Sequence, residues 1–483
     1  MACVSGTAWA MTMDDAQKSL LRKIPSVDLL LADPQFEPYR AELGAKVVAD
    51  AIREATEAVR EGIVGGAVSE ACEADLRARI VADAAQGLAA LARPFYGRAV
   101  NATGIILHTG LGRAVLAPKA LDQIRETLQG YSVLQVDRHT GRRSRRDERI
   151  EGLVRRLTGA EAATVVNNNA AATAIVLNTV AKARAVIVSR GQLVEIGGSF
   201  RLPDVMAFSG ARLVEVGTTN KTHAKDYEQA ITQDTAAILR VHPSNYRIQG
   251  FSAEVPAEVL ARIAHEHNLV FIDDVGAGAL IDLAQFGFEP EPTLQDAVRN
   301  GADIVTCSAD KLIGGSQAGL ILGKKGLIDS VRKNQFARIV RPGKLTLAVL
   351  EATLKLFLDQ EVALREVPTL QMLRRASDQI KEHAERLAAG LQQVVKAAAV
   401  STLSGLSEMG SGSLPTQGLA TTLVAIEPKA IDAESLVRRL RLHEPPVFAR
   451  IQEDRVLIDP RTLRYGDDAI LLEAVAEALA EGR

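Results

Sequence analysis

Seven short apolar segments alternate with helical segments between about residues 100 and 330, and this alternation constrains the fold more than any other feature. Most of the apolar segments are rich in β-branched residues, which favour strands. The pattern predicts βαβ units and a mainly parallel sheet that helices cover on both faces. The predicted strands are ATVVN (163–167), AVIVS (185–189), RLVEVG (212–217), AAILRVH (236–242), LVFIDD (269–274), ADIVTC (302–307) and AGLILG (318–323).

Regions of different pattern flank this α/β region. Residues 14 to about 93 carry apolar residues at helical spacing without a strand-like run, which predicts helices only. Two helical stretches, from roughly 345 to 397, precede a smaller region that mixes strand-like and helical segments. We expect an N-terminal helical domain at 1–85, a large domain at 86–345, and linker helices with a small α+β domain at 346–483.

Composition narrows the class of protein. The chain has 483 residues and a net charge of −2, which gives no global attraction to nucleic acid or to an anionic membrane. Cys3, Cys72 and Cys307 form no CxxC pair, so neither a disulfide framework nor a zinc site is expected. The segment MACVSGTAWAM lacks the basic start of a signal peptide, and the longest apolar segment, AAATAIVLNTVA, is too short and too polar to span a bilayer. We expect a cytoplasmic protein.

The first of three informative strand ends is TVVNNNAAATAIVL. A strand ends near Val166 and a helix begins close behind it, so the backbone N–H groups of Asn168, Asn169 and Ala170 are candidates to bind a phosphate. The alternative is an asparagine-capped helix that needs no ligand.

The second strand end is LVFIDDVGAG, where an apolar strand delivers Asp273 and Asp274. A buried carboxylate is costly without a cationic partner, and a protonated pyridine nitrogen is one such partner. A capping or turn role for one of the two aspartates is the alternative.

The third is TCSADKLIGGSQAG, in which Lys311 follows a strand and precedes a glycine-rich turn. Pyridoxal 5'-phosphate requires a lysine that forms a Schiff base and an aspartate beside its ring nitrogen. Lys311 and Asp274 are spaced for a helix and a strand between them, and Ser308 could reach the same phosphate. A solvated loop lysine is the alternative.

Longer motifs carry a resemblance to a family. VNATGIILHTGLGRA (100–114), SRGQLVEIGGSFRLPDVM, VGTTNKTHAKDYEQAI, VHPSNYRIQGF and SADKLIGGSQAGLILGKK together resemble the bacterial selenocysteine synthases, the L-seryl-tRNA(Sec) selenium transferases. The resemblance runs from about residue 18 to beyond 460. It implies an aspartate-aminotransferase-like fold (fold type I) with pyridoxal phosphate, acting on seryl-tRNA(Sec) with selenium from selenophosphate, in a homo-oligomer built from dimers. It also implies that the N-terminal helices recognise tRNA.

The resemblance also assigns residues. Lys311 takes the Schiff-base position, Asp310 is its adjacent carboxylate, and Asp274 rather than Asp273 matches the aspartate for the ring nitrogen. Arginines that hold the phosphate of the selenium donor fall at Arg113, Arg338 and Arg341; the last two are three residues apart and would share a face if helical.

One segment departs from the family pattern. GRRSRR (141–146) stands where G-x-R-G-S-R is expected, which leaves open which arginine faces the site. Residues 138–156, with eight arginines against three acidic residues, are either a solvated helix entry or a contact with tRNA or another subunit.

Two other functions stay open: a related pyridoxal-phosphate lyase that acts on a small amino acid or sugar acid without tRNA, and a non-enzymatic tRNA-binding protein.

Overall fold

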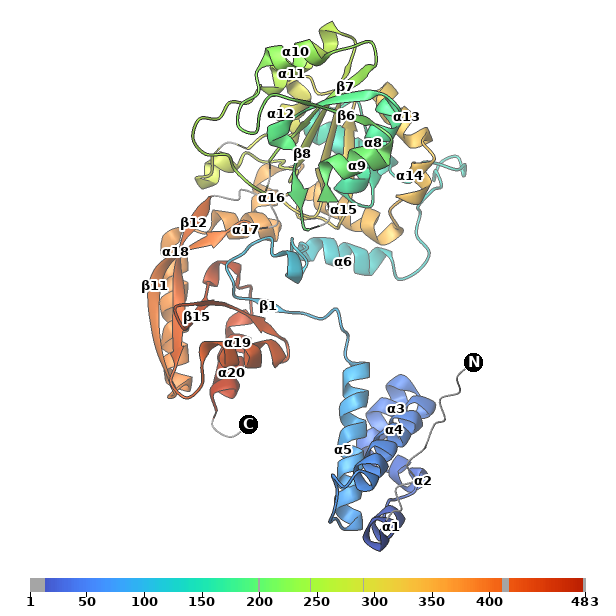
Figure 1. The fold of residues 1–483 in the computed structure, drawn as a ribbon, viewed down its shortest axis with the longest axis vertical. Helices are drawn as coiled ribbons and strands as arrows, with labels where there is room; N and C mark the ends of the chain where they lie inside the picture. Colours follow the sequence, from blue (N-terminus) through green and yellow to red (C-terminus); the bar gives the residue numbers. More distant parts are fainter. Residues whose placement is uncertain (1–13, 199, 244, 290, 411–416, 481–483) are drawn as a thin grey trace, which may run out of the picture. The chain divides into compact units, whose positions relative to one another are not determined.

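The computed structural model describes residues 14–198, 200–243, 245–289, 291–410 and 417–480 (Figure 1). The segment MACVSGTAWAM lies outside these residues. The chain divides into two compact units, Met1–Arg98 and Ala99–Arg483, here called unit 1 and unit 2. Within the described ranges, no helix combines the length and the apolar character needed to cross a membrane.

The described part of unit 1 is helical, as the sequence predicts. Three helix starts are set by Asp14, Ser26 and Asp33, whose side chains accept hydrogen bonds from backbone N–H groups of the first turn. The apolar faces of the helices meet in one core that includes Leu30, Phe36, Ile52, Ile63 and Ile80. The elements are α1 (Asp15–Arg22), α2 (Val27–Leu31), η1 (Pro34–Phe36), α3 (Glu37–Leu43), α4 (Ala45–Val64) and α5 (Glu73–Ala92).

The expected domain boundary after residue 85 falls inside α5, and unit 1 extends to Arg98. The helix continues because Leu88 is buried in the core of unit 1. It ends at Ala92 because Arg93 precedes Pro94, and a residue before proline is disfavoured in the helical conformation. Arg93 is accordingly extended, with φ −71° and ψ 129°.

Unit 2 contains the predicted, mainly parallel sheet of seven strands, in the order β2-β10-β9-β8-β7-β3-β6. β10 is antiparallel to both of its neighbours. The connection 309–318 between β9 and β10 is too short for the crossover that a parallel neighbour requires. The strands are β2 (Ala162–Val166), β3 (Ala185–Ser189), β6 (Arg212–Val216), β7 (Thr235–Val241), β8 (Val270–Gly276), β9 (Ile304–Ser308) and β10 (Gly319–Gly323).

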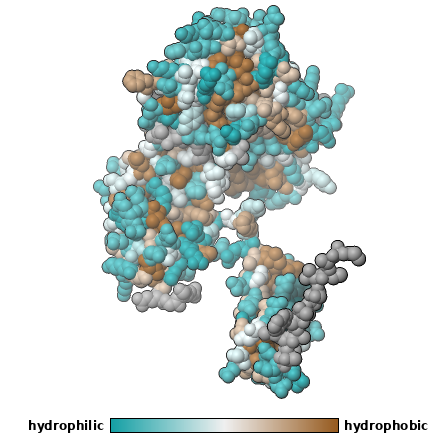
Figure 2. All heavy atoms as spheres, viewed as in Figure 1, coloured by the Kyte–Doolittle hydropathy of each residue, from teal (hydrophilic) through white to brown (hydrophobic). Residues whose placement is uncertain are grey.

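Helices cover both faces of this sheet, because successive strand residues point to opposite sides. On β8, Phe271 belongs to one buried cluster and Ile272 to the other. The first cluster joins the sheet to α7 (Glu148–Thr158), α11 (Ala257–Glu266), α12 (Leu294–Arg299) and α15 (Lys344–Leu356). The second joins it to α8 (Asn169–Ala181), α9 (Leu202–Ser209) and α13 (Lys325–Lys333). On the face drawn in Figure 2, hydrophilic residues predominate over the surface of unit 2, with hydrophobic patches between them.

The C-terminal part of unit 2 is a smaller α+β region with its own core. It follows α16 (Gln360–Glu366) and α17 (Pro368–Arg374), and its sheet has the order β11-β12-β15-β14. Residues 100–102, expected in the large domain, pack here because β1 (Val100–Asn101) pairs with β13 (Val447–Phe448). The remaining elements are α18 (Ser377–Val394), β11 (Ala398–Glu408), β12 (Gly418–Pro428), α19 (Ala433–Leu442), β14 (Arg450–Gln452), β15 (Arg455–Ile458) and α20 (Asp467–Leu479).

Candidate active site

Lys311 lies just beyond the carboxyl end of β9 and is 6% exposed, which contradicts the alternative of a solvated loop lysine. Burial lowers the pKa of Lys311, and the charge of Arg113 lowers it further, while Asp310 and Asp274 act in the opposite direction. A lowered pKa favours the neutral amine, which is the form that attacks a carbonyl carbon.

Asp274 points from β8 toward α8. Asn169 Nδ2 donates to Asp274 Oδ1 over 2.9 Å, and Thr173 Oγ1 donates to Asp274 Oδ2 over 2.9 Å. Residues four apart on a helix share a face, so α8 presents both donors together. Burial raises the pKa of Asp274 and outweighs these hydrogen bonds. The carboxylate therefore favours a positively charged group beside it.

Asp273 points to the opposite face of the sheet. Arg240 Nη1 donates to both carboxylate oxygens, over 3.0 and 3.1 Å, and Asp273 is fully buried. Since Asp273 already has a cation, Asp274 is the one of the two strand-end carboxylates that faces α8 and Lys311.

The start of α8 combines two roles that the sequence offered as alternatives. Asn168 caps the helix, because its side chain accepts a hydrogen bond from Ala171 N at 2.9 Å. Asn169 Oδ1 is buried and has no hydrogen-bond partner among the described residues. A side chain at Gly319 would approach the Asn168 carbonyl oxygen to 2.2 Å, so the backbone is closely packed against this helix start.

Ser308 ends β9 and is 8% exposed. It pairs with Gly319, which pairs in turn with Val166 at the end of β2. The predicted phosphate-binding residues Ser308, Asn168, Asn169 and Ala170 therefore occupy one edge of the sheet. The polar groups here fit pyridoxal phosphate, because the N-terminus of α8 suits a phosphate. The buried carboxylate of Asp274, held by Asn169 and Thr173 of the same helix, suits a protonated ring nitrogen.

Arg113 is held against the loop of Lys311. Its Nη1 donates to Asp310 Oδ2 over 2.7 Å, and Asp310 O accepts a hydrogen bond from Ala114 N over 3.4 Å. Arg113 has φ 63°, a left-handed conformation that is uncommon outside glycine. Such strain persists where surrounding contacts impose it, often at functional sites.

Arg338 and Arg341 are not on one helical face. α14 (Phe336–Ile339) contains Arg338 but ends before Arg341. The expectation of a shared face is wrong because Pro342 disfavours the helical conformation of the residue before it. Val340 O accepts a hydrogen bond from Asn167 N over 2.9 Å, so this segment lies at the carboxyl end of β2. In the part of the chain that the structure describes, no hydrogen bond or ion pair joins Arg338 or Arg341 to Lys311 or Arg113.

Sequence reasoning missed one residue of the site, Thr173, and left open which arginine of GRRSRR faces the site. Thr173 could have been found from its spacing of four residues from Asn169. Arg146, the last residue of GRRSRR, lies near Arg341 and Arg338, whose charges lower its pKa in addition to the larger effect of burial. No sequence signal distinguished Arg146 from the arginines beside it.

Comparison with known proteins places these features in a family. A family model described as L-seryl-tRNA selenium transferase matches residues 99–464, and one described as selenocysteine synthase N terminal matches residues 21–60. An L-seryl-tRNA(Sec) selenium transferase from Desulfomicrobium baculatum is 46% identical over 464 residues, 96% of this chain and 99% of the relative. One from Solidesulfovibrio magneticus is 46% identical over 466 residues, 96% of this chain and 98% of the relative.

A solved structure supports the fold. D-glucosaminate-6-phosphate ammonia-lyase superposes with a TM-score of 0.55 at 21% identity, covering 79% of this chain and 95% of that chain. At this identity the likeness speaks for the fold alone.

Proposed function

Because this chain belongs to the L-seryl-tRNA selenium transferase family, we propose that it converts L-seryl-tRNA(Sec) into L-selenocysteinyl-tRNA(Sec), with selenophosphate as the selenium donor. The chain is a fold type I enzyme that depends on pyridoxal phosphate, as the sequence predicts. The observation that carries the proposal is the match of the family model across residues 99–464, which contains the whole cluster around Lys311.

The reaction replaces the hydroxyl group on Cβ of the seryl residue with selenium. Hydroxide is a poor leaving group, so direct displacement is unfavourable. Pyridoxal phosphate, when bound, supplies an electron sink that stabilises negative charge on Cα. Lys311 Nζ takes the proton from Cα, which its lowered pKa favours. The Cβ–O bond then breaks, and the hydroxyl leaves as water with the proton taken by Lys311. Selenium of selenophosphate forms the new bond to Cβ while Cα regains a proton, and hydrolysis of the P–Se bond releases phosphate.

The other residues orient and balance charge. Asp274 keeps the pyridine nitrogen protonated by the stabilising effect of an opposite charge, with Asn169 and Thr173 holding its carboxylate. Asn168, Ala170 and Ser308 take the cofactor phosphate. Asp310 is the carboxylate adjacent to Lys311, and its negative charge favours the ammonium form of the lysine.

Arg113, Arg338 and Arg341 hold the phosphate of the selenium donor. Guanidinium groups suit this role because their planar donors match phosphate oxygens. Within the described residues, neither Arg338 nor Arg341 is in an ion pair, so both are free for an anion.

Unit 1 recognises the tRNA. Residues 1–85 hold nine Lys and Arg against fourteen Asp and Glu, so broad electrostatic attraction cannot provide the contact. A local cluster such as Arg22 and Lys23 would recognise the shape of the tRNA instead.

The chain acts as a homo-oligomer, with dimers as the basic unit of a ring. Several large apolar side chains of unit 2 are more than half exposed and support this, among them Tyr131, Val133, Phe208, Ile339 and Leu345. Mass measurement in solution tests the oligomeric state, and an active monomer would refute the homo-oligomer.

We place the enzyme in the cytoplasm.

The decisive experiment supplies purified holoenzyme with seryl-tRNA(Sec) and selenophosphate, and with free serine in a parallel reaction. Formation of selenocysteinyl-tRNA(Sec) supports the proposal. Turnover of free serine without turnover of the charged tRNA would instead support a lyase that acts on small amino acids.

A further inference from the structure

Four arginines from two distant segments gather beside the carboxyl end of β2. Burial lowers the pKa of Arg146, and the charges of Arg341, Arg143 and Arg338 lower it further, with only Asp147 opposing them. Arg143 and Arg146 belong to GRRSRR, whereas Arg338 and Arg341 follow α13.

These four guanidinium groups have no carboxylate partner among the described residues. Arg146 Nη1 donates to Pro342 O over 3.0 Å and its Nη2 donates to Gln135 Oε1 over 2.8 Å, and both acceptors are neutral. Neighbouring arginines differ, because Arg145 pairs with Glu151 and Arg149 with Glu351. The charge of Asp147 offsets part of the repulsion among the arginines, and a bound anion would remove more of it.

A cavity adjoins the cluster. It has a volume of about 200 Å³, and two of the four arginines, Arg146 and Arg341, line it together with Gln135, Asp147 and several apolar residues. Sites for drug-sized ligands measure roughly 300–1,000 Å³. The space therefore suits a small oxyanion better than a nucleotide.

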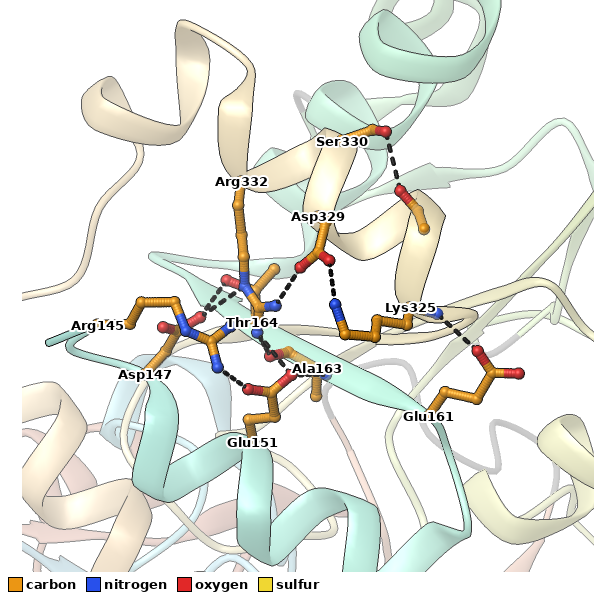
Figure 3. A network of polar contacts seen from close by, with 11 residues as sticks. Arg145, Asp147, Glu151, Glu161, Ala163, Thr164, Lys325, Asp329, Ser330 and Arg332 are labelled. Atoms are coloured by element: carbon orange, nitrogen blue, oxygen red, sulfur yellow. Dashed lines mark hydrogen bonds and ion pairs between the residues drawn. The ribbon is translucent and has the colours of Figure 1, made fainter.

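A partly buried polar network joins α13 to Asp147 and Glu151 (Figure 3). Arg332 of α13 donates to Asp147 over 3.4 Å, to Glu151 over 2.9 Å and to Asp329 over 2.9 Å. Asp147 adjoins Arg146, and α13 leads directly into the segment of Arg338 and Arg341. Both segments are therefore anchored to Arg332. This anchoring preorganises the arginines for ligand binding.

We propose that Arg146 is a further phosphate-binding residue of the selenium-donor site, where it acts with Arg338 and Arg341 on the phosphate group of the donor. This inference rests on the proposed function. It also assigns the arginine of GRRSRR that faces the site, which the sequence alone left open.

The test compares wild-type holoenzyme with Arg146→Gln and with Arg149→Gln, a control of equal charge change on the same segment. Inorganic phosphate is the probe, and its dissociation constant is measured by calorimetry, together with the KM for selenophosphate and the Kd for tRNA(Sec). We expect Arg146→Gln to weaken phosphate binding and raise the KM by about tenfold or more, the usual effect of a lost charged hydrogen bond. The Kd for tRNA(Sec) and the values for Arg149→Gln should stay unchanged.

An unchanged phosphate affinity in Arg146→Gln would overturn the inference, and so would weaker tRNA binding with unchanged phosphate binding, which would assign Arg146 to a tRNA phosphate. If Arg146→Gln does not fold, Arg146→Lys keeps the charge but loses the planar fork, and weaker phosphate binding is still expected. Calorimetry needs no turnover. A wild-type enzyme that binds phosphate through Arg146 yet makes no selenocysteinyl-tRNA(Sec) would contradict the proposed function alone.

Discussion

Arg113 Nη1 and Asp310 Oδ2 lie 2.7 Å apart, although 197 positions separate the two residues in the chain. The ion pair places a positive charge and a negative charge beside Lys311, and it ties the segment after β1 to the connection between β9 and β10. Its effect on Lys311 is measurable, because the two charges shift the pKa of the lysine in opposite directions.

We expect Arg113→Met to raise the pKa of Lys311. The substitution removes a cation that disfavours the ammonium form, and it leaves Asp310 without its partner, so both changes act in the same direction. Capture of pyridoxal phosphate by the apoprotein requires the neutral amine, so its pH dependence should move to higher pH. Stopped-flow absorbance across a pH series measures this. Arg149→Met is the control. A profile of Arg113→Met that matches the profile of wild type or of Arg149→Met would contradict the prediction.

Asp274→Asn should reduce turnover far more than it reduces stability. The asparagine keeps polar contacts with Asn169 and Thr173 but loses the charge opposite the ring nitrogen. Breaking a buried charge pair costs about 3–5 kcal/mol, which corresponds to a rate loss of about 10²- to 5 × 10³-fold. Single-turnover kinetics and thermal melting separate the two effects.

Asp273→Asn is the matched control. It leaves Arg240 buried without its carboxylate, so the melting temperature should fall while the absorbance of the bound cofactor stays close to wild type. A larger kinetic defect in Asp273→Asn than in Asp274→Asn would reverse the assignment of the two aspartates.

Gly319→Ala should weaken cofactor binding. An added Cβ would meet the Asn168 carbonyl oxygen at 2.2 Å and would displace the start of α8. Gly326→Ala is the control, because the added Cβ would meet no atom within 4 Å beyond its chain neighbours and the backbone of its own helix. Equilibrium dialysis with pyridoxal phosphate compares them, and equal affinities in the two variants would show that α8 tolerates the displacement.

Arg332→Met should destabilise unit 2 by about 3–5 kcal/mol, because it leaves the carboxylate of Asp147 without its ion pair and leaves Glu151 with Arg145 alone. Burial by itself would raise the pKa of Glu151, but the hydrogen bonds and charges of Arg332 and, to a smaller extent, Arg145 together outweigh it and the pKa is lowered. The stabilisation is therefore complete above the ordinary pKa of 4.5 and is lost as the pH falls through the lowered value.

Chemical denaturation at neutral and acidic pH measures the difference between Arg332→Met and wild type, which should shrink in acid. Arg299→Met is the control, since Arg299 is 73% exposed in its pair with Asp296 and exposed pairs contribute at most about 1 kcal/mol. A pH-independent difference for Arg332→Met would mean that packing, and not charge, stabilises the network.

The predictable part of the site consists of residues at strand ends. Lys311 and Asp274 follow β9 and β8, and the carboxyl ends of adjacent parallel strands meet at one edge of a sheet. The antiparallel direction of β10 could have been predicted from the short connection that contains Lys311. The end of α14 before Arg341 could have been predicted from Pro342.

Other features depend on side-chain directions that a sequence pattern does not encode. In the sequence, Arg332 is one of several polar residues on an amphipathic helix. In the structure, its guanidinium is half-buried between two carboxylates from another segment. The pairing of β1 with β13 joins two segments that lie near opposite ends of the amino-acid sequence of unit 2. Neither strand is longer than two residues. Short pairings of this kind carry no periodicity from which to predict them.

A chain that starts at Ala99 should keep its cofactor and lose affinity for tRNA(Sec). Unit 1 buries its own core, and the residues around Lys311 and Asp274 all belong to unit 2, so removal of unit 1 leaves the cofactor site intact. The start at Ala99 avoids cutting α5, which a start near residue 86 would do.

Absorbance of the bound cofactor and binding of tRNA(Sec) across a salt series measure the two properties. Because residues 1–85 carry an excess of acidic residues, few phosphate contacts are expected, and the affinity of the full chain should fall only gently with salt. Arg22→Gln in the full chain should reproduce part of the loss, since Arg22 is exposed and has no ion-pair partner among the described residues. The competing view is that these helices only brace the oligomer. It predicts a smaller assembly with unchanged tRNA affinity per subunit and an unchanged salt slope, and that result would falsify a role of unit 1 in tRNA recognition.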